Sequence, residues 1–203
     1  MLTAYAKGIG TGAGLIIAIG AQNAFVLSQG VRKNHYLTIA LICALCDAIL
    51  VAVGVTGVGT MFAASPLLTR IAGMGGAAFL FVYGARAFQS AFRGNQMETD
   101  NDAATSLKAV VLATLAVTLL NPHVYIDTVL LLGSIASQFQ PPEHLAFGAG
   151  AVTASFAWFF SLSIGATFLA PLFRKKRAWQ ILDSFVGVVM WTIAASLVRG
   201  VAV

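Results

Sequence analysis

Two aspartates, Asp47 and Asp127, lie within stretches of sequence that are otherwise apolar. Asp47 is in the middle of an apolar run, and Asp127 follows a polar interruption by one helical turn. An aspartate at the centre of a membrane helix costs about 2.5–3.5 kcal/mol on insertion scales, so such residues usually face a partner or a cavity. The two carboxylates are therefore candidate binding groups for cations. The plainer alternatives for Asp47 are a structural ion pair with Arg86 or Arg70 and a side chain that is simply protonated.

Two polar interruptions, Gly20–Phe25 and Asn121–Asp127, divide long apolar runs. They lie about 100 residues apart, roughly half the chain, which is the spacing expected of two homologous halves. Nothing in hydrocarbon hydrates a free backbone group, so a break at membrane depth is tolerated only where it lines an enclosed or water-filled cavity. Broken helices at matching positions of two halves indicate a solute site near the midplane. The pattern is typical of a transporter.

The composition predicts which elements must position these groups. Of the 203 residues, 59% are hydrophobic and only 9% are charged, against about 25% charged in soluble domains. The length suits about six membrane spans and leaves no room for a separate soluble domain. The first apolar run reads as a retained span and not as a signal peptide. The expected spans are Leu2–Leu27, Leu37–Phe62, Leu67–Phe92, Ala109–Ile135, Leu145–Leu172 and Trp179–Val198.

A polar linker divides these spans into three and three. The expected fold is an all-α integral membrane domain over residues 1–203, with pseudo-repeats 1–92 and 108–203, a linker over 93–107 and breaks in the first and fourth helices. Three spans per half would place the halves in opposite orientations, as an inverted repeat.

The formal net charge of +5 is mostly a topology signal. Lys7, Arg70 and Arg199 lie on the side of the N-terminus, and the other side carries Arg32, Lys33, Arg93, Lys108 and the run Arg174–Arg177. Because cytoplasmic loops retain positive charge, this bias predicts that both termini face outward. The basic run lies in a short connection, so it is interpreted as a cytoplasmic anchor and not as a nucleic-acid site.

The remaining reactive residues indicate no metal site. Cys43 and Cys46 form a C-x-x-C pattern, but no second pair completes four ligands, so buried apolar cysteines are expected. His123 lies at the second break, where a polar cap on the broken helix is the plainer role. Asp183 is near a span end beside Trp179, which predicts a solvated interfacial position. No cofactor and no catalytic residue are predicted.

Five segments carry a resemblance to a known family. They are Gly20–Gly30 (GAQNAFVLSQG), Cys46-Asp47, Gly75–Leu80 (GGAAFL), Leu119–Thr128 (LLNPHVYIDT) and Ala154–Phe160 (ASFAWFF). With them the chain resembles the LysE/ArgO family of basic amino acid exporters over nearly its whole length. The extended NPHVYxDT string is the part most specific to the lysine and arginine branch.

The resemblance implies export of L-lysine or L-arginine across the bacterial inner membrane. The expected mechanism is secondary transport in exchange for protons, within the lipid bilayer, by a single chain or a homo-oligomer. No Walker-type nucleotide motif is present, so ATP hydrolysis by this chain is not expected. The residues expected to bind substrate are Gly20, Gln22, Asn23, Asp47, Asn121, Pro122, His123, Tyr125 and Asp127.

Two other functions use the same acids. Asp47 and Asp127 could form the shared-proton dyad of an intramembrane aspartyl hydrolase, although no further motif supports one. An ion or metal permease could also use the two carboxylates, but it would leave the Gln- and Asn-rich break less well explained.

Overall fold

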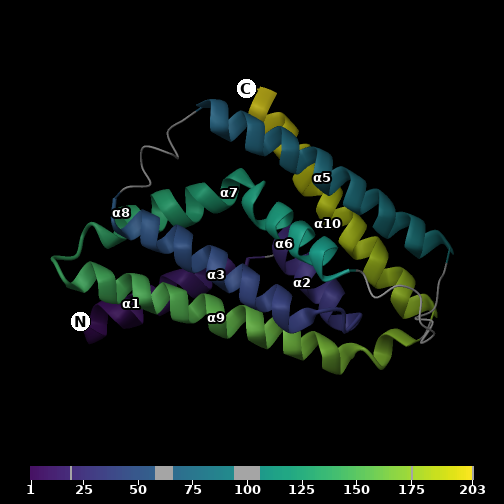
Figure 1. Ribbon diagram of the computed structural model, residues 1–203, viewed down its shortest axis with the longest axis horizontal. Helices are drawn as coiled ribbons and strands as arrows, with labels where there is room; N and C mark the ends of the chain where they lie inside the picture. Colours follow the sequence, from purple (N-terminus) through teal and green to yellow (C-terminus); the bar gives the residue numbers. More distant parts are fainter. Residues whose placement is uncertain (19, 58–65, 94–105, 175, 203) are drawn as a thin grey trace.

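The chain folds into helices, and the long ones lie side by side, roughly along the long axis of the molecule (Figure 1). The computed structural model describes residues 1–18, 20–57, 66–93, 106–174 and 176–202, and it contains no strand within these ranges. The α-helices are α1 (Leu2–Ile16), α2 (Ala21–Val31), α3 (Tyr36–Val55), α5 (Pro66–Arg93), α6 (Leu107–Leu119), α7 (Pro122–Val124), α8 (Leu132–Ala136), α9 (Glu143–Leu169) and α10 (Lys176–Ala202). A π-helical segment, η1 (Tyr125–Leu131), joins α7 to α8, and a 3-10 turn, η2 (Leu172–Arg174), precedes α10.

The chain is an all-α membrane protein, and five of the six expected spans match its helices to within a few residues. The exception is Leu37–Phe62: α3 ends at Val55, and 58–62 lie outside the described residues. Among the described residues, three helices are long and apolar enough to cross a membrane, namely α3, α9 and Lys176–Arg199 of α10. The pair α1 and α2 qualifies jointly but bends by 80°, and the pair α6 and Pro122–Ala136 bends by 61°. The predicted breaks in the first and fourth spans are therefore confirmed. Counting each bent pair as one span gives five candidate spans within the described residues, against the six expected.

Contacts along α9 define the direction of the first broken span and of α3. Gly8 of α1 lies against Phe147, and Asn23 of α2 lies beside Trp158, so the broken span runs in the same direction as α9. Helix α3 runs the opposite way, because Tyr36 at its start lies beside Ser163 near the end of α9. The first broken span and α3 therefore cover α9 along its length from two sides.

The second broken span packs parallel to α3. Cys43 of α3 lies 4.0 Å from Thr118 of α6 (Sγ to Oγ1), and Gly54 lies against Gly133 of α8, so the two elements run in the same direction. The two broken spans are thus antiparallel to each other, as inverted halves require. Homology between the two halves stays a prediction.

Helices α5 and α10 form a second antiparallel pair at the side of this group (Figure 1). Gly76 of α5 packs near Leu197, whereas Ala91 near the end of α5 accepts a hydrogen bond from Gln180 near the start of α10. The stacked rings of Phe81 and Trp191 have centroids 5.2 Å apart.

Small residues allow the close approach of α1 to α9. A Cβ on Gly8 would collide with the Phe147 carbonyl, and one on Gly12 would lie 2.9 Å from the Cα of Ala151. In lipid, where no hydrophobic effect drives helices together, such close backbone packing supplies much of the association energy. Packing explains these two glycines but not Gly10 and Gly14, where an added Cβ would meet no atom of the described residues within 4 Å.

Helix ends that carry basic residues converge at the end of the molecule away from the N-terminus (Figure 1). The end of α2, the end of α5 and the starts of α6 and α10 meet there, and residues of all four line one cavity. Of the predicted linker, 94–105 lies outside the described residues, as does Lys175. We refer below to this end as the basic end; that it faces the cytoplasm stays a prediction from the charge bias.

Candidate functional site

A cavity of about 240 Å³ lies where the two helix breaks meet α3. Seven of the nine residues expected to bind substrate line it: Gly20, Gln22, Asn23, Asp47, Asn121, His123 and Asp127. Pro122 and Tyr125 are not among its lining residues. The structure thus brings both aspartates and both breaks to one polar space, although they are spread over more than half of the sequence.

The first break exposes two helix ends to this cavity. Gly20 is the N-cap of α2 with extended backbone (φ −136°, ψ 176°), and no side chain caps the helix. The first N–H groups of a helix have no intrahelical partner and carry partial positive charge, so the start of α2 suits an anion. The amide nitrogen of Gln22 is buried there without a hydrogen-bond partner among the described residues, which adds a second free donor.

Asn23 holds the first break open. Its Nδ2 donates to the carbonyl oxygens of Ile16 (2.8 Å) and Ala18 (2.9 Å), at the end of α1. Its Oδ1 accepts a hydrogen bond from Trp158 Nε1 of α9 at 3.1 Å. Both amide hydrogens are thus used inside the protein, so Asn23 supports the cavity wall more than it offers groups to a ligand.

Asn23→Leu is therefore expected to lower stability. The change leaves two carbonyl oxygens and the Trp158 N–H without their partner, which should cost about 2 kcal/mol. The measurement is thermal unfolding of purified protein in detergent. Gln22→Leu is the matched control, because it makes the same amide-to-leucine change at a residue whose amide nitrogen has no partner; an equal loss of stability in both variants would contradict the capping role of Asn23.

The second break is held by a different set of groups. Asn121 has extended backbone (φ −94°, ψ 107°), and its Oδ1 accepts a hydrogen bond from the backbone N–H of His123 at 3.2 Å. Pro122 occupies the first position of α7, where its missing N–H leaves no donor unpaired. Tyr125 donates from its hydroxyl to the Leu119 carbonyl at 2.8 Å, at the end of α6. Asn121 marks the bend, as its position before proline predicts.

Asp127 lies in the π-helical segment that follows this break. Single turns of π-helix inside α-helices are often found at functional sites, because the extra residue changes which side chains face inward. Asp127 and its neighbour Thr128 both line the cavity. The apolar pattern of this stretch gave no sign of the π-helical turn.

Asp47 reaches the same cavity from α3. It is 5% exposed, and its Oδ2 accepts a hydrogen bond of 2.7 Å from Ser155 Oγ of α9. The alternative ion pair with Arg86 or Arg70 does not form, because both arginines are exposed and the ion pairs within the described part of the chain are Met1–Glu143 and Arg32–Asp183. Asp47 is therefore a buried carboxylate that faces a cavity and has one neutral donor on it.

Comparison with known proteins identifies the family of this chain. The chain matches the LysE type translocators over residues 13–200. It belongs to the LysE type translocator family. The resemblance found in the sequence is thereby confirmed.

Relatives within this family are similar over their full length. A putative amino-acid transporter, YggA, of Aeromonas salmonicida is 46% identical over 195 residues, which are 96% of this chain and 95% of the relative. The arginine exporter protein ArgO of Pectobacterium atrosepticum is 42% identical over 98% of both chains. ArgO of Salmonella typhi is 42% identical over all of this chain and 97% of its own length. No solved structure is significantly similar.

The contacts of several residues of this LysE type translocator were not predicted from the sequence. Ser155 and Trp158 hold Asp47 and Asn23, and both lie in a segment that was noted only for its resemblance. The expectation for Asp183 was wrong: it is 1% exposed and paired with Arg32, because the start of α10 packs against the end of α2 and covers it.

Cys43 and Cys46 are both buried and free, as expected for cysteines that pack as small apolar side chains. Within the described ranges no group of three or more His, Cys, Asp or Glu residues is arranged to hold a metal ion. Cys43 packs against α6, and its contact with Thr118 assigns it to helix packing.

Proposed function

We propose that this LysE type translocator exports L-arginine, and L-lysine as a close analogue, across the bacterial inner membrane in exchange for protons. The observation that carries the proposal is the cavity that Asp47 and Asp127 line together with the start of α2. Relatives of nearly the same length and 42% identity are named arginine exporters. A binding site between broken helices is the arrangement that secondary transporters use for polar solutes.

The charges in the cavity match those of a basic amino acid. Arginine carries two cationic groups and one carboxylate. Asp47 and Asp127 provide two acids for the cations, and the start of α2 provides unpaired N–H groups and a positive helix end for the carboxylate. Gln22 adds a neutral donor that can orient the ligand. A volume of about 240 Å³ is just below the range of about 300–1,000 Å³ typical of small-molecule sites, which suits a single amino acid.

Exchange for a proton balances the electrical work of export. Moving a substrate of net charge +1 outward against about 100 mV costs about 2.3 kcal/mol, and an entering proton returns the same amount. Arginine and a proton would compete for the same carboxylates, so the carrier would release one before it takes the other. One-for-one exchange then leaves only the pH gradient and the substrate gradient to drive the cycle.

The first expected result is arginine transport by the purified protein in proteoliposomes. Counterflow of radiolabelled arginine should occur when unlabelled arginine is loaded inside, and net transport should increase when a pH gradient is imposed. Lysine should compete with arginine, because both carry a side-chain cation, whereas leucine and glutamate should compete weakly.

The same vesicles separate the other functions. An ion or metal permease would conduct cations in the absence of any amino acid, and an aspartyl hydrolase would produce no counterflow. Protein-free liposomes and the Asp47→Asn variant are the controls. Absence of arginine counterflow from well-folded, correctly inserted protein would reject the proposed function; counterflow that ignores the pH gradient would reject only the proton exchange.

A further inference from the structure

A second polar cavity lies at the basic end of the molecule. Its volume is about 340 Å³, and it is enclosed by α2, α5, α6 and α10. Its polar lining includes Gln29, Arg32, Asn34, Tyr83, Arg86 and Asp183. The substrate proposal above uses none of these residues.

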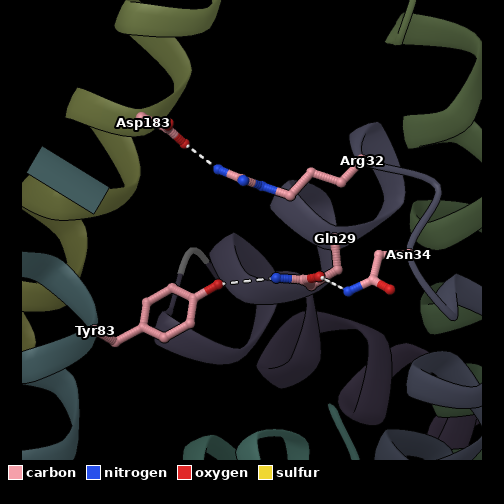
Figure 2. Close-up of polar contacts among 5 residues, drawn as sticks. All are labelled: Gln29, Arg32, Asn34, Tyr83 and Asp183. Atoms are coloured by element: carbon pink, nitrogen blue, oxygen red, sulfur yellow. Dashed lines mark hydrogen bonds and ion pairs between the residues drawn. The ribbon is translucent and has the colours of Figure 1, made fainter. Parts of the chain in front are cut away.

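An ion pair closes this cavity on one side. Arg32 extends from the end of α2 to Asp183 on α10, with 2.7 Å between Arg32 Nη2 and Asp183 Oδ1 (Figure 2). The Arg32 guanidinium also lies over the Trp179 ring, 4.6 Å from its centroid. Arg32 is 35% exposed, whereas Asp183 is 1% exposed. The arginine therefore lies at the rim of the cavity and covers the carboxylate.

The pair is incompletely satisfied. Asp183 Oδ2 and Arg32 Nε are both buried without a hydrogen-bond partner among the described residues. A buried carboxylate normally gains its stability from donors on both oxygens, because an unpaired oxygen loses its hydration without compensation. A single guanidinium nitrogen thus holds one oxygen of Asp183, in place of the bidentate fork that arginine and carboxylate usually form.

A second set of contacts, beside the ion pair, consists of neutral hydrogen-bonding groups (Figure 2). Gln29 Nε2 donates to the Tyr83 hydroxyl at 3.0 Å, and Asn34 Nδ2 donates to Gln29 Oε1 at 2.9 Å (Figure 2). Arg86 of α5 also lines the cavity and is exposed. The lining thus holds one buried acid, an arginine that forms no ion pair within the described residues and suits a carboxylate, and neutral amide and hydroxyl groups.

Helix α2 connects this second cavity to the cavity at the two helix breaks, which we call the central cavity. Its first residues, Ala21 to Asn23, line the central cavity. Phe25, Ser28 and Gln29 farther along the helix line the second one, as does Arg32 at its C-cap. At 1.5 Å per residue, Gln22 and Arg32 are separated by about 15 Å along the helix. The second cavity therefore lies one helix length from Asp47 and Asp127, toward the basic end.

We propose that the second cavity is a docking site at which a basic amino acid binds before it reaches the central cavity, and that the substrate's side-chain cation displaces Arg32 from Asp183. The inference rests on the proposed export of arginine. Arg32 presents to Asp183 the same guanidinium group that arginine carries. The ion pair of the empty protein therefore has the same chemistry as the contact that the substrate would make with Asp183. The substrate carboxylate would lie toward Arg86, and departure of Arg32 would open the cavity at its rim.

The test is the Michaelis constant for arginine on each face of the membrane. Initial rates of radiolabelled arginine transport are measured in inside-out and in right-side-out membrane vesicles. Asp183→Asn removes the docking carboxylate and should raise KM at least about fivefold on the face of the basic end, with KM on the other face nearly unchanged. Arg32→Gln removes the internal competitor and should lower KM on that same face about threefold.

KM shifts in opposite directions in Asp183→Asn and Arg32→Gln distinguish a docking site from a purely structural ion pair. A structural pair would lose stability in both variants and would shift KM in the same direction, or not at all; either result overturns the proposal. Glu143→Gln is the matched control, because it removes the acid of the other described ion pair, with the N-terminus of Met1, at the far end of the molecule. It should leave KM unchanged on both faces.

A milder variant covers the case in which Arg32→Gln does not insert stably. Arg32→Lys keeps the positive charge but replaces the planar fork by a point charge, which an incoming guanidinium displaces more easily. Its KM at the basic end should also fall, by about twofold, and an unchanged or higher KM overturns the proposal. Wild-type vesicles without any arginine transport would reject the export function itself, whereas wild-type transport with unshifted KM in these variants rejects the docking site alone.

Discussion

Asp47→Asn and Asp127→Asn are each expected to reduce arginine export by about 100-fold or more, with normal membrane insertion. Removing one partner of a desolvated charge pair typically costs about 2–5 kcal/mol of binding, and about 1.4 kcal/mol corresponds to a factor of ten. Asparagine keeps the shape of the side chain but cannot balance the substrate's cations. Insertion should be unaffected or easier, because the variants remove a charge from the apolar interior.

The measurement is the initial rate of arginine counterflow at equal amounts of reconstituted protein, together with a fluorescence-detected size-exclusion profile that checks folding. Ser155→Ala is the graded control for Asp47. It removes the hydrogen bond to Oδ2 but leaves the carboxylate in the cavity, so its rate should fall only by a factor of about ten, which corresponds to about 1.5 kcal/mol for one hydrogen bond to a charged group. Near wild-type counterflow in both asparagine variants would remove the carboxylates from the binding site.

Gly20→Leu is expected to abolish transport while the protein remains folded. Gly20 lies between the two helices of the first break, and within the described residues the nearest atom to a Cβ at this position is the Ala18 carbonyl oxygen, at 4.0 Å. Its backbone is extended, a conformation that other residues also adopt. The obstacle to a larger residue is therefore the ligand and not the fold: a leucine side chain would fill part of a cavity of about 240 Å³ and cover the start of α2.

Gly20→Ala is the matched control, because its methyl group makes only an ordinary contact at this position. It should retain at least about half of the wild-type rate, since one methyl group occupies little of the cavity and extended backbone suits alanine. Binding of arginine, followed by protection against thermal unfolding, should be lost in Gly20→Leu and kept in Gly20→Ala. Arginine protection of Gly20→Leu equal to that of wild type would show that the substrate does not bind at the first break.

The apolar helices, the two breaks and the two acids of the central cavity could all be predicted from the sequence alone. Each of these is a local property of the chain. Hydrocarbon requires long apolar helices. Gly20 and Pro122 each favour an interruption of a continuous helix, and an aspartate within an apolar run is tolerated in few places other than a cavity. Asp47 and Asp127 could be singled out on this basis, and the structure places both at one cavity.

The contacts that support these groups, and the burial of Asp183, could not be predicted from the sequence. Asn23 and Tyr125 point back to the ends of α1 and α6, and Ser155 reaches Asp47 from a helix more than 100 residues away in the chain. Asp183 is buried because α10 packs against α2. These contacts depend on how each helix is rotated about its axis. In a nearly uniformly apolar membrane sequence, the pattern of apolar and polar residues does not indicate which face of a helix packs against its neighbours. The packing of small residues against neighbouring backbones sets the rotation instead, and this becomes visible only when all the helices are in place.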